Sequence, residues 1–369
     1  MRETFLQFGT GNFLRAFADL FVSEENRAGR EAGLIVAVQS TGAERARELN
    51  DRGCRYPVAI RGFSEGQIID EIVSVDSISR VLVAFSDWEE ILKVAASPDL
   101  KWILSNVTEA GLALEPLDQL SDEPPASFPA KLLQCLSARF QAGIGGITIL
   151  PCELVPENGS AVKKLVLQQA ALWNCAPDFI TWLKSNCRWI NTLVDRIVPG
   201  KPITHRLLES EPLLISTEPF QFWAMEGNAA DLPLTGHRAV VTSNDISGYA
   251  LRKVRILNGA HTALVCKAMP LGIATVREAV ENPEVENWLR KLLFDEIVPV
   301  LIGRVDEPEL FAKQTLDRFA NPFLDHKLSD IAKGHEGKMA LRLQPTLEEY
   351  RIRFGREPEL LTPLFSSTP

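Results

Sequence analysis

The chain has 369 residues, of which 46% are hydrophobic and 24% are charged. This composition is typical of a soluble enzyme, and the length suggests two domains or one domain with a large extension. The formal net charge of −9 argues against a general affinity for nucleic acid, because no basic stripe with interleaved aromatic residues offsets it. Every apolar run is too short for a membrane span, and no signal-peptide pattern follows Met1, so a cytoplasmic location is expected.

The cysteines and histidines suggest neither disulfides nor a metal site. Six cysteines, at positions 54, 135, 152, 175, 187 and 266, form no CxxC pair and no regular framework. They are therefore expected to be reduced thiols. His326 and His335 are isolated, and no His, Asp and Glu spacing typical of a metal site occurs.

The first 39 residues predict the opening of a dinucleotide-binding unit. Residues 4–8 indicate a short buried strand, Gly9-Thr10-Gly11 a tight turn, and residues 12–28 an amphipathic helix. Gly9 would permit the turn, and Gly11 would let a pyrophosphate approach the backbone at the helix N-terminus. Leu14 stands where the GxGxxG motif has its third glycine, so the motif alone is weak. Its setting between a strand and a helix supports the prediction.

The second predicted strand leaves the cofactor open between NAD and NADP. Residues 33–38 are a buried parallel-type strand that ends at Gln39-Ser40-Thr41. No Asp or Glu stands there to hold a ribose diol, and Arg45 and Arg47 lie just beyond.

Two later strands end in polar residues. The segment 102–109 is strand-like up to Asn106 and Thr108, and the segment 146–150 runs into Pro151-Cys152-Glu153. Ligands of open α/β folds bind at the carboxyl edge of the sheet, so Asn106, Thr108 and Glu153 are candidates for the nicotinamide neighbourhood. For each residue alone, a helix cap or turn role is the simpler interpretation.

The rest of the chain becomes mostly helical towards its end. A helix is predicted over 130–141, and a helical pattern over 160–190 precedes Asp195-Arg196, which could be a surface ion pair. Residues 207–245 suggest short strands or loops. Later helices are expected over 262–268, 285–293 and 310–319. The predicted domains are therefore residues 1–245 and residues 246–369.

The segment 253–261 brings together an amine, an amide and an imidazole. On an ideal helix Lys253, Asn258 and His261 would fall within an arc of roughly 140° and span about 12 Å. Lys253 could exchange a proton with a substrate oxygen, Asn258 could hydrogen-bond that oxygen, and His261 could orient the pair. The alternative is an amphipathic helix with solvated Lys253 and Arg255 and a local break at Asn258-Gly259.

Four blocks resemble the polyol-specific long-chain dehydrogenases, also called the mannitol dehydrogenase family. They are residues 7–17, 105–111, 193–197 and 253–261. Segments 151–154, 257–265 and 318–323 resemble the branch of this family that interconverts tagaturonate and altronate. The resemblance runs from about residue 5 to residue 346.

The resemblance implies an α/β fold, with a Rossmann-type N-terminal domain and a mostly α-helical C-terminal domain. It also implies metal-independent, NAD-dependent hydride transfer, in the cleft between them, that interconverts a keto-hexuronate and an aldonate. Lys253 matches the general acid/base, Asn258 an oxyanion-hole amide, and His261 the histidine that supports the lysine and binds substrate. The residues expected to contact NAD are Phe8, Gly9, Gly11, Asn12, Phe13, Gln39, Asn106, Thr108 and Glu109.

A sugar acid or polyol is the small molecule that the resemblance predicts as substrate. Asp195 matches a residue near the polyol, and Glu153 is also expected to contact the substrate. A hexuronate also needs a carboxylate anchor, and Arg318, Lys338 and Arg342 lie where the family places substrate-binding cations. An exposed helical charge is an equally good interpretation of each cation.

Two departures from the family pattern leave alternatives open. Leu154 stands where mannitol dehydrogenases carry a second amide donor, so Asn258 acts alone or another residue such as Asn158 contributes. Only residues 346–369 follow Pro345, which could leave the cleft more open to water. The alternatives are a mannitol, mannitol 1-phosphate or fructuronate dehydrogenase, or an NAD-binding protein without turnover. The oligomeric state stays open between monomer and dimer.

Overall fold

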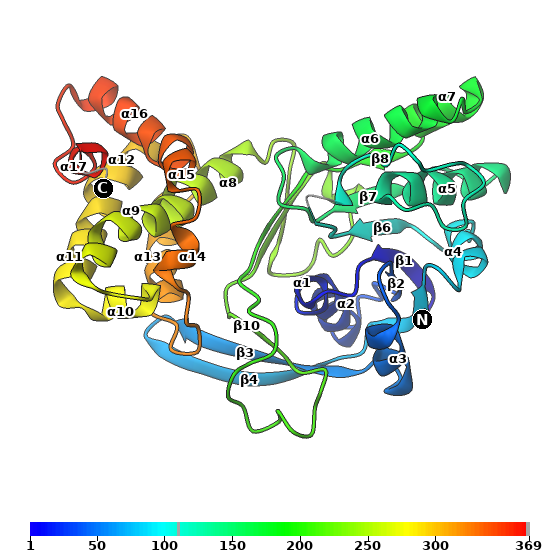
Figure 1. Ribbon diagram of the computed structural model, residues 1–369, viewed down its shortest axis with the longest axis horizontal. Coiled ribbons are helices and arrows are strands. Elements are labelled where there is room, and N and C mark those ends of the chain that lie inside the picture. Colours follow the sequence, from blue (N-terminus) through cyan, green and yellow to red (C-terminus); the bar gives the residue numbers. More distant parts are fainter. Residues whose placement is uncertain (109–110, 367–369) are drawn as a thin grey trace. The chain divides into compact units, whose positions relative to one another are not determined.

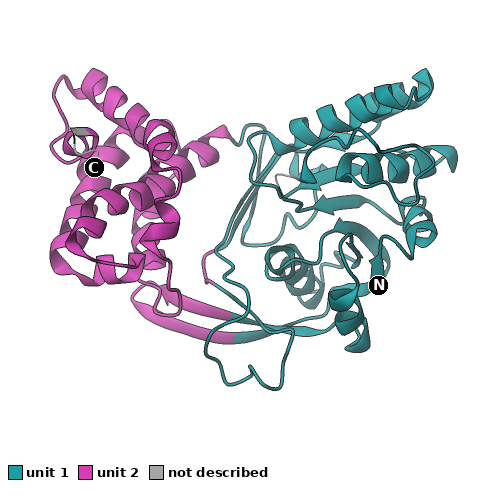
Figure 2. Ribbon diagram, viewed as in Figure 1, with its two compact units in different colours: residues 1–59, 72–217, 221–246 teal, residues 60–71, 218–220, 247–369 magenta. Residues whose placement is uncertain are grey.

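The computed structural model describes residues 1–108 and 111–366, which form two compact units (Figure 2). Unit 1 consists of residues 1–59, 72–217 and 221–246. Unit 2 consists of residues 60–71, 218–220 and the described residues from 247 onward. The sequence places a boundary near 245, but it does not anticipate that 60–71 and 218–220 join unit 2.

Unit 1 is built on a six-stranded sheet with the order β5-β2-β1-β6-β7-β8 (Figure 1). Every neighbouring pair in this sheet is parallel. The order changes direction between β1 and β6, the point at which open α/β sheets bind ligands. The predicted Rossmann-type fold is therefore confirmed. The strands are β1 Glu3–Phe8, β2 Leu34–Gln39, β5 Ile78–Val83, β6 Trp102–Ser105, β7 Thr148–Pro151 and β8 Arg188–Trp189.

Apolar side chains on both faces of β1 and β2 hold this sheet between helices. Leu6, Phe8, Val36 and Val38 belong to one core cluster with residues of α4, α5, α6 and α7. Helices α5, α6 and α7 lie together on one face of the sheet (Figure 1). The helices of unit 1 are α1 Asn12–Arg15, α2 Ala18–Arg27, α3 Glu44–Asp51, α4 Trp88–Ala95, α5 Phe128–Gln141, α6 Asn158–Leu172 and α7 Pro177–Ser185.

The single helix expected over residues 12–28 is two helices, α1 and α2. Phe17 leaves helical geometry, with φ −130° and ψ −94°. The carbonyls before the break find side-chain donors, because Tyr56 donates to the Arg15 carbonyl and Arg196 donates to the Ala16 carbonyl. Tertiary hydrogen bonds thus replace the helical bonds that a continuous helix would make.

The remaining strands form two three-stranded sheets. One has the order β10-β3-β4 and the other the order β12-β11-β9. In the second sheet β11 is parallel to β12 and antiparallel to β9. The strands are β3 Tyr56–Ser64, β4 Gln67–Val75, β9 Thr192–Asp195, β10 Ile215–Thr217, β11 Phe222–Glu226 and β12 Val240–Ser243.

Unit 2 is helical apart from the tip of the β3–β4 hairpin. Its core surrounds α9 and the π-helix before it, where Ile256, Leu257, Ala260 and Leu264 are buried. The helices are α8 Ser247–Arg252, the π-helix Lys253–Asn258, α9 Gly259–Ala268, α10 Val276–Glu281, α11 Pro283–Lys291, the π-helix Leu292–Ile297, α12 Val298–Leu301, α13 Pro308–Phe319, α14 Leu328–Ile331, α15 His335–Arg342, α16 Gln344–Phe354 and α17 Thr362–Ser366. Within the described residues, no helix has the length and apolar character needed to cross a membrane.

Candidate active site

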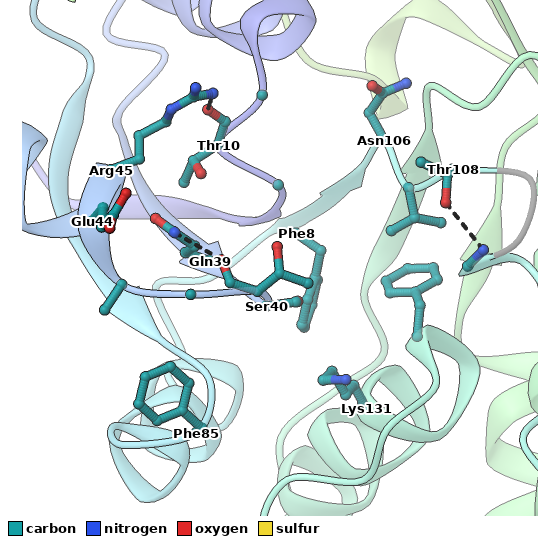
Figure 3. A pocket seen from close by; sticks show the side chains of 18 of the residues that line it. Phe8, Thr10, Gln39, Ser40, Glu44, Arg45, Phe85, Asn106, Thr108 and Lys131 are labelled. Carbon is teal, nitrogen blue, oxygen red and sulfur yellow. Dashed lines mark hydrogen bonds between the residues drawn. The ribbon is translucent and has the colours of Figure 1, made fainter.

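A cavity of about 880 Å³ lies at the carboxyl ends of the central strands of unit 1 (Figure 3). Arg45, Glu44 and Phe85 lie on one side of it, and Asn106 and Thr108 lie on the other (Figure 3). Its wall consists of Phe8, Gly9, Thr10, Gly11, Gln39, Ser40, Thr41, Gly42, Ala43, Glu44, Arg45, Arg47, Phe85, Asn106, Val107, Thr108, Gly111, Ala126, Phe128 and Lys131.

The glycine turn of this cavity fits a dinucleotide. Gly9 has φ +126°, and a Cβ there would lie 3.2 Å from Leu14 Cδ1. A side chain at Gly9 would therefore be strained as well as crowded. A Cβ at Gly11 would meet nothing within 4 Å, so the backbone before α1 is open to the cavity. Free N–H groups at that helix start favour a phosphate group.

Most of the residues predicted to contact NAD line this cavity. They are Phe8, Gly9, Gly11, Gln39, Asn106 and Thr108. Asn12 and Phe13 do not belong to its described wall, because Asn12 Oδ1 accepts a hydrogen bond from Arg15 and the Phe13 ring stacks on Phe17. Glu109 lies outside the described residues.

Lys131 and Phe85 are cavity residues that the sequence did not single out. Lys131, in the first turn of α5, donates a hydrogen bond to the Ala126 carbonyl, and burial lowers its pKa. Phe85 follows β5 and is 59% exposed, which is unusual for a phenyl ring next to a core strand. From the sequence, Phe85 could have been noticed only as an aromatic residue at an exposed position. Its place in the cavity depends on how β5 pairs within the sheet.

Hydrogen bonds tie the ends of β6 and β7 together. Asn106 Nδ2 donates to the Cys152 carbonyl at 2.7 Å, and the Val107 amide donates to Glu153 Oε1 at 3.0 Å. Burial raises the pKa of Glu153, and the Val107 amide opposes that rise. Glu153 therefore shapes the strand ends, and its contact with substrate stays a prediction.

Asn158 is a structural clamp, so the suggestion that it supplies a second oxyanion donor is wrong. Its side-chain amide donates to the Pro151 and Glu153 carbonyls at 3.0 and 3.1 Å and contacts Thr192 Oγ1 at 3.2 Å. Its Oδ1 accepts from the Thr192 amide at 2.8 Å. These partners use the whole hydrogen-bonding capacity of its NH₂ group. Leu154 is 73% exposed.

Asp195 ends β9, and the surface ion pair considered for Asp195 and Arg196 is wrong. Both side chains are buried. Arg196 Nη1 donates to the Ala16 carbonyl at 3.0 Å. Asp195 is therefore buried at the end of β9, and its place near the substrate stays a prediction.

In unit 2, Lys253 and Asn258 are the first and last residues of a π-helix that runs directly into α9. The ideal α-helix assumed from the sequence is therefore wrong for this segment. The Gly259 amide bonds to the Val254 carbonyl, five residues earlier. A turn closed over five residues brings positions 253 and 258 nearer to one face than an α-helix would, and such turns are frequent at functional sites.

Packing explains why the helix continues through Asn258-Gly259 instead of breaking there. A Cβ at Gly259 would lie 3.3 Å from Leu343 Cδ2 and 3.7 Å from the Arg342 carbonyl, so glycine allows close contact with the end of α15. Arg255 is not solvated as the alternative interpretation required. It donates to Thr346 Oγ1 at 2.7 Å and pairs with Glu349 at 3.2 Å.

His261 is a buried imidazole with one nitrogen unused. Its Nε2 has no hydrogen-bond partner in the described part of the chain. The ring centroid lies 4.3 Å from that of Phe319 and 4.9 Å from that of His326. Burial lowers the pKa of His261 well below its ordinary value, and the nearby His326, Arg318 and Arg342 lower it further. The imidazole is thus neutral at neutral pH, and Nε2 can interact with a substrate hydroxyl.

Helix α15 carries two neighbouring cations, Arg342 and Lys338, of which Arg342 lies beside this histidine. Arg342 Nη1 donates to Thr262 Oγ1 at 3.2 Å, which places the guanidinium next to His261. Lys338, one turn earlier on α15, donates to the Ile331 carbonyl at 2.7 Å. Burial and the neighbouring Arg342 lower the pKa of Lys338.

Arg318 is held by a carboxylate of unit 2. Its Nε and Nη2 donate to Glu218 at 3.0 and 2.8 Å. Sequence reasoning did not identify Glu218, which lies 100 residues from Arg318 along the chain, and it treated His326 as an isolated histidine.

Two family models match the chain, one over its N-terminal part and one over its C-terminal part. The family model described as mannitol dehydrogenase Rossmann domain matches residues 3–235, and the mannitol dehydrogenase C-terminal domain matches residues 245–366. The chain belongs to the mannitol dehydrogenase family. Members of this family are oxidoreductases, so the expected enzyme class is confirmed.

Among its relatives in the mannitol dehydrogenase family are several altronate oxidoreductases. The chain is 38% identical to the one from Bacillus subtilis (strain 168), over 99% of this chain and 78% of the relative. It is 38% identical to that of Halalkalibacterium halodurans, over 99% of this chain and 73% of the relative. The altronate oxidoreductase of Phocaeicola vulgatus is 36% identical over 97% of this chain and 78% of the relative.

Two solved dehydrogenase structures share the fold. Mannitol 2-dehydrogenase of Pseudomonas fluorescens, in a ternary complex with NAD and D-mannitol, superposes with a TM-score of 0.77 at 23% identity and covers 99% of this chain and 78% of its own. A D-sorbitol dehydrogenase in substrate-free form gives a TM-score of 0.85 at 22% identity, and the match covers 97% of this chain and 78% of its own.

Proposed function

We propose that this protein is an altronate oxidoreductase, which reduces tagaturonate to altronate with NADH and catalyses the reverse reaction with NAD. The observation that carries the proposal is the similarity, at 36–38% identity over nearly the whole chain, to three proteins of that name. The geometry of both units supports it. Unit 1 has a cavity lined by a glycine turn at the sheet's change of direction, and unit 2 has the groups needed for carbonyl chemistry.

The cofactor of the proposal is NAD, held by the cavity of unit 1. The open backbone at Gly11 would hold the pyrophosphate, and Gln39 at the end of β2 would contact the ribose next to adenine. Asn106 and Thr108 would contact the nicotinamide end. When bound, NADH supplies the hydride.

Lys253, Asn258 and His261 then carry out the proton chemistry. In the direction of reduction, the Lys253 ammonium donates its proton to the carbonyl oxygen as hydride reaches the carbonyl carbon, so that the ketone becomes a secondary alcohol. The Asn258 amide donates a hydrogen bond to the same oxygen as negative charge develops. His261 Nε2, buried and without a partner among the described residues, accepts a hydrogen bond from a substrate hydroxyl. For oxidation Lys253 acts in its neutral form.

The sugar-acid carboxylate of the proposed substrate binds to Arg342 and Lys338. Arg342 lies next to His261 through its hydrogen bond to Thr262, and its planar guanidinium can bind a carboxylate at two points. Arg318 is already paired with Glu218, so its proposed contribution is to the positive potential and not to direct carboxylate contact. An uncharged polyol could accept hydrogen bonds from these cations but would form no ion pair with them.

The experiment that tests the proposal measures NADH oxidation with tagaturonate, fructuronate, fructose and fructose 6-phosphate. Tagaturonate should give the highest kcat/KM, and Lys253→Ala should lower it by about three orders of magnitude or more. Lys267→Ala is the matched control, because Lys267 lies on α9 but pairs with Glu284. Unchanged turnover in Lys253→Ala would refute the mechanism. NADH binding without turnover of any of the four sugars would refute the catalytic proposal as a whole.

A further inference from the structure

We propose that the cavity of unit 1 also has a subsite for a phosphate on the 2′ position of the adenosine ribose. The protein would then use NADP(H) as well as NAD(H). The inference rests on the proposed function only in assuming that the cavity holds a nicotinamide dinucleotide.

The adenosine end of the cavity follows from the position of the glycine turn. Gly9 and Gly11, which follow β1, indicate where the pyrophosphate would bind. Asn106 and Thr108, which follow β6, lie to one side of that position. The residues that follow β2 therefore face the adenosine. Figure 3 shows Arg45 and Glu44 on this side, together with Phe85, whose exposed ring offers a flat surface to the adenine.

Gln39 stands where NAD-specific folds of this type place an acidic residue. An Asp or Glu there binds the ribose 2′-hydroxyl and repels a 2′-phosphate. Gln39 is uncharged, and its Nε2 donates to the Thr41 carbonyl at 2.9 Å. The side chain is only 9% exposed, and its Oε1 has no hydrogen-bond partner among the described residues. It lines the cavity, so this oxygen is available to a ribose hydroxyl.

Two guanidinium groups reach the same region from α3. Arg45 and Arg47 both line the cavity, and Arg45 Nη1 makes a 3.3 Å hydrogen bond to the Thr10 carbonyl. Arginine beside the ribose is the usual means by which dinucleotide-binding folds hold a 2′-phosphate. The exposed Ser40 and Thr41 of the preceding loop carry hydroxyls that can donate to the same group.

Glu44, the first residue of α3, is the opposing charge in this subsite. Its exposed carboxylate also lines the cavity. Two arginines against one glutamate leave a local charge of +1, and the start of α3 adds free N–H groups, because no side chain caps it. This net positive charge favours binding of a phosphate dianion, and the Glu44 carboxylate weakens that attraction.

The test compares the binding of adenosine 2′,5′-bisphosphate and of ADP to the purified chain by calorimetry at fixed ionic strength. These probes report on the subsite without any turnover. The variants are Arg45→Ala, Arg47→Ala and Glu44→Gln. Arg52→Ala is the matched control, because Arg52 follows the same helix but pairs with Glu211 outside the cavity wall.

The wild type should bind the bisphosphate at least as tightly as ADP. Arg45→Ala and Arg47→Ala should each weaken bisphosphate binding by about tenfold or more while changing ADP binding less than about twofold. Glu44→Gln should strengthen bisphosphate binding selectively, and Arg52→Ala should change neither ligand. ADP binding with bisphosphate binding about a hundredfold weaker would overturn this inference and leave the proposed function intact. Failure of NADH, ADP and the bisphosphate all to bind would overturn both.

Discussion

Arg318 and Glu218 form a two-point ion pair in which the two side chains are 3% and 2% exposed. The guanidinium also lies over the Phe220 ring, 4.2 Å from its centroid. A guanidinium held in this way is fixed in position, and its charge still acts on its surroundings. Arg318 acts on His261 in this way, because its charge lowers the pKa of that imidazole together with burial, His326 and Arg342.

Glu218→Gln is expected to lower the free energy of unfolding by about 3–5 kcal/mol, because it leaves the Arg318 charge buried without its carboxylate. Chemical denaturation measures this loss. Exposed Glu89→Gln, which breaks a surface pair with Lys93, is the control and should cost no more than about 0.5 kcal/mol. If Glu218→Gln kept full stability but raised KM, Arg318 would be a direct substrate anchor instead.

Arg342→Ala should act on the substrate carboxylate. We expect KM for tagaturonate to rise by about ten- to a hundredfold, with a much smaller change for fructose, which has no carboxylate. Arg342→Lys should restore only part of the loss, because an ammonium cannot form the two-point contact. Steady-state kinetics on both sugars provide the measurement. Equal losses on tagaturonate and fructose would show that Arg342 has a general structural role.

His261 should remain neutral throughout the working pH range. Burial and three neighbouring cations or histidines lower its pKa, so kcat/KM for reduction should show no decline assignable to an ordinary imidazole near pH 6.5. His261→Ala should lower kcat by about a hundredfold or more. His335→Ala, on α15 and in contact with Cys266, is the control. A decline near pH 6.5 in the wild type that disappears in His261→Asn would contradict this assignment.

The sequence predicted the parts of the fold that depend on local patterns. The strand, glycine turn and second strand of residues 4–38 follow from apolar runs and from Gly9, whose φ of +126° a side chain would resist. The helical character of unit 2 follows from periodicity in the same way. The β3–β4 hairpin was not predicted, because β4 is largely exposed and shows no buried face for a pattern to reveal.

The candidate site was predictable only where its residues are neighbours in the chain. Lys253, Asn258 and His261 lie within one segment, but their geometry depends on a π-helix that packing at Gly259 against α15 permits. Glu218 and Arg318 are 100 residues apart, and His326 reaches His261 from a loop after α13. Such contacts are set by tertiary structure and leave no trace in local spacing.

Asn158→Ala should destabilise the protein, because Asn158 donates to two backbone carbonyls at the end of β7 and receives a hydrogen bond from the Thr192 amide. Loss of these bonds in a buried position should lower the free energy of unfolding by about 2–4 kcal/mol. Leu154→Ala, at an exposed position, should be close to neutral. A large fall in kcat with unchanged stability would restore Asn158 as a substrate donor.

Asp19 should give the protein a distinctive pH dependence of stability. Its carboxyl group is buried and accepts a 3.0 Å hydrogen bond from Tyr56, and burial raises its pKa from 3.8 to about 7. Between these two values the folded state keeps a proton that the unfolded chain has released. The folded state therefore binds more protons, and stability falls as pH rises through this window and levels off above about pH 7.

Asp19→Asn removes this titration while keeping a similar shape. The stability of the variant relative to wild type should therefore rise by about 2–3 kcal/mol between pH 5 and pH 8, as measured by denaturant unfolding at each pH. Asp99→Asn, which alters an exposed pair with Arg2, serves as the control for the general effect of removing a carboxylate. A constant difference between Asp19→Asn and wild type across this range would mean that Asp19 titrates at its ordinary pKa in the folded protein.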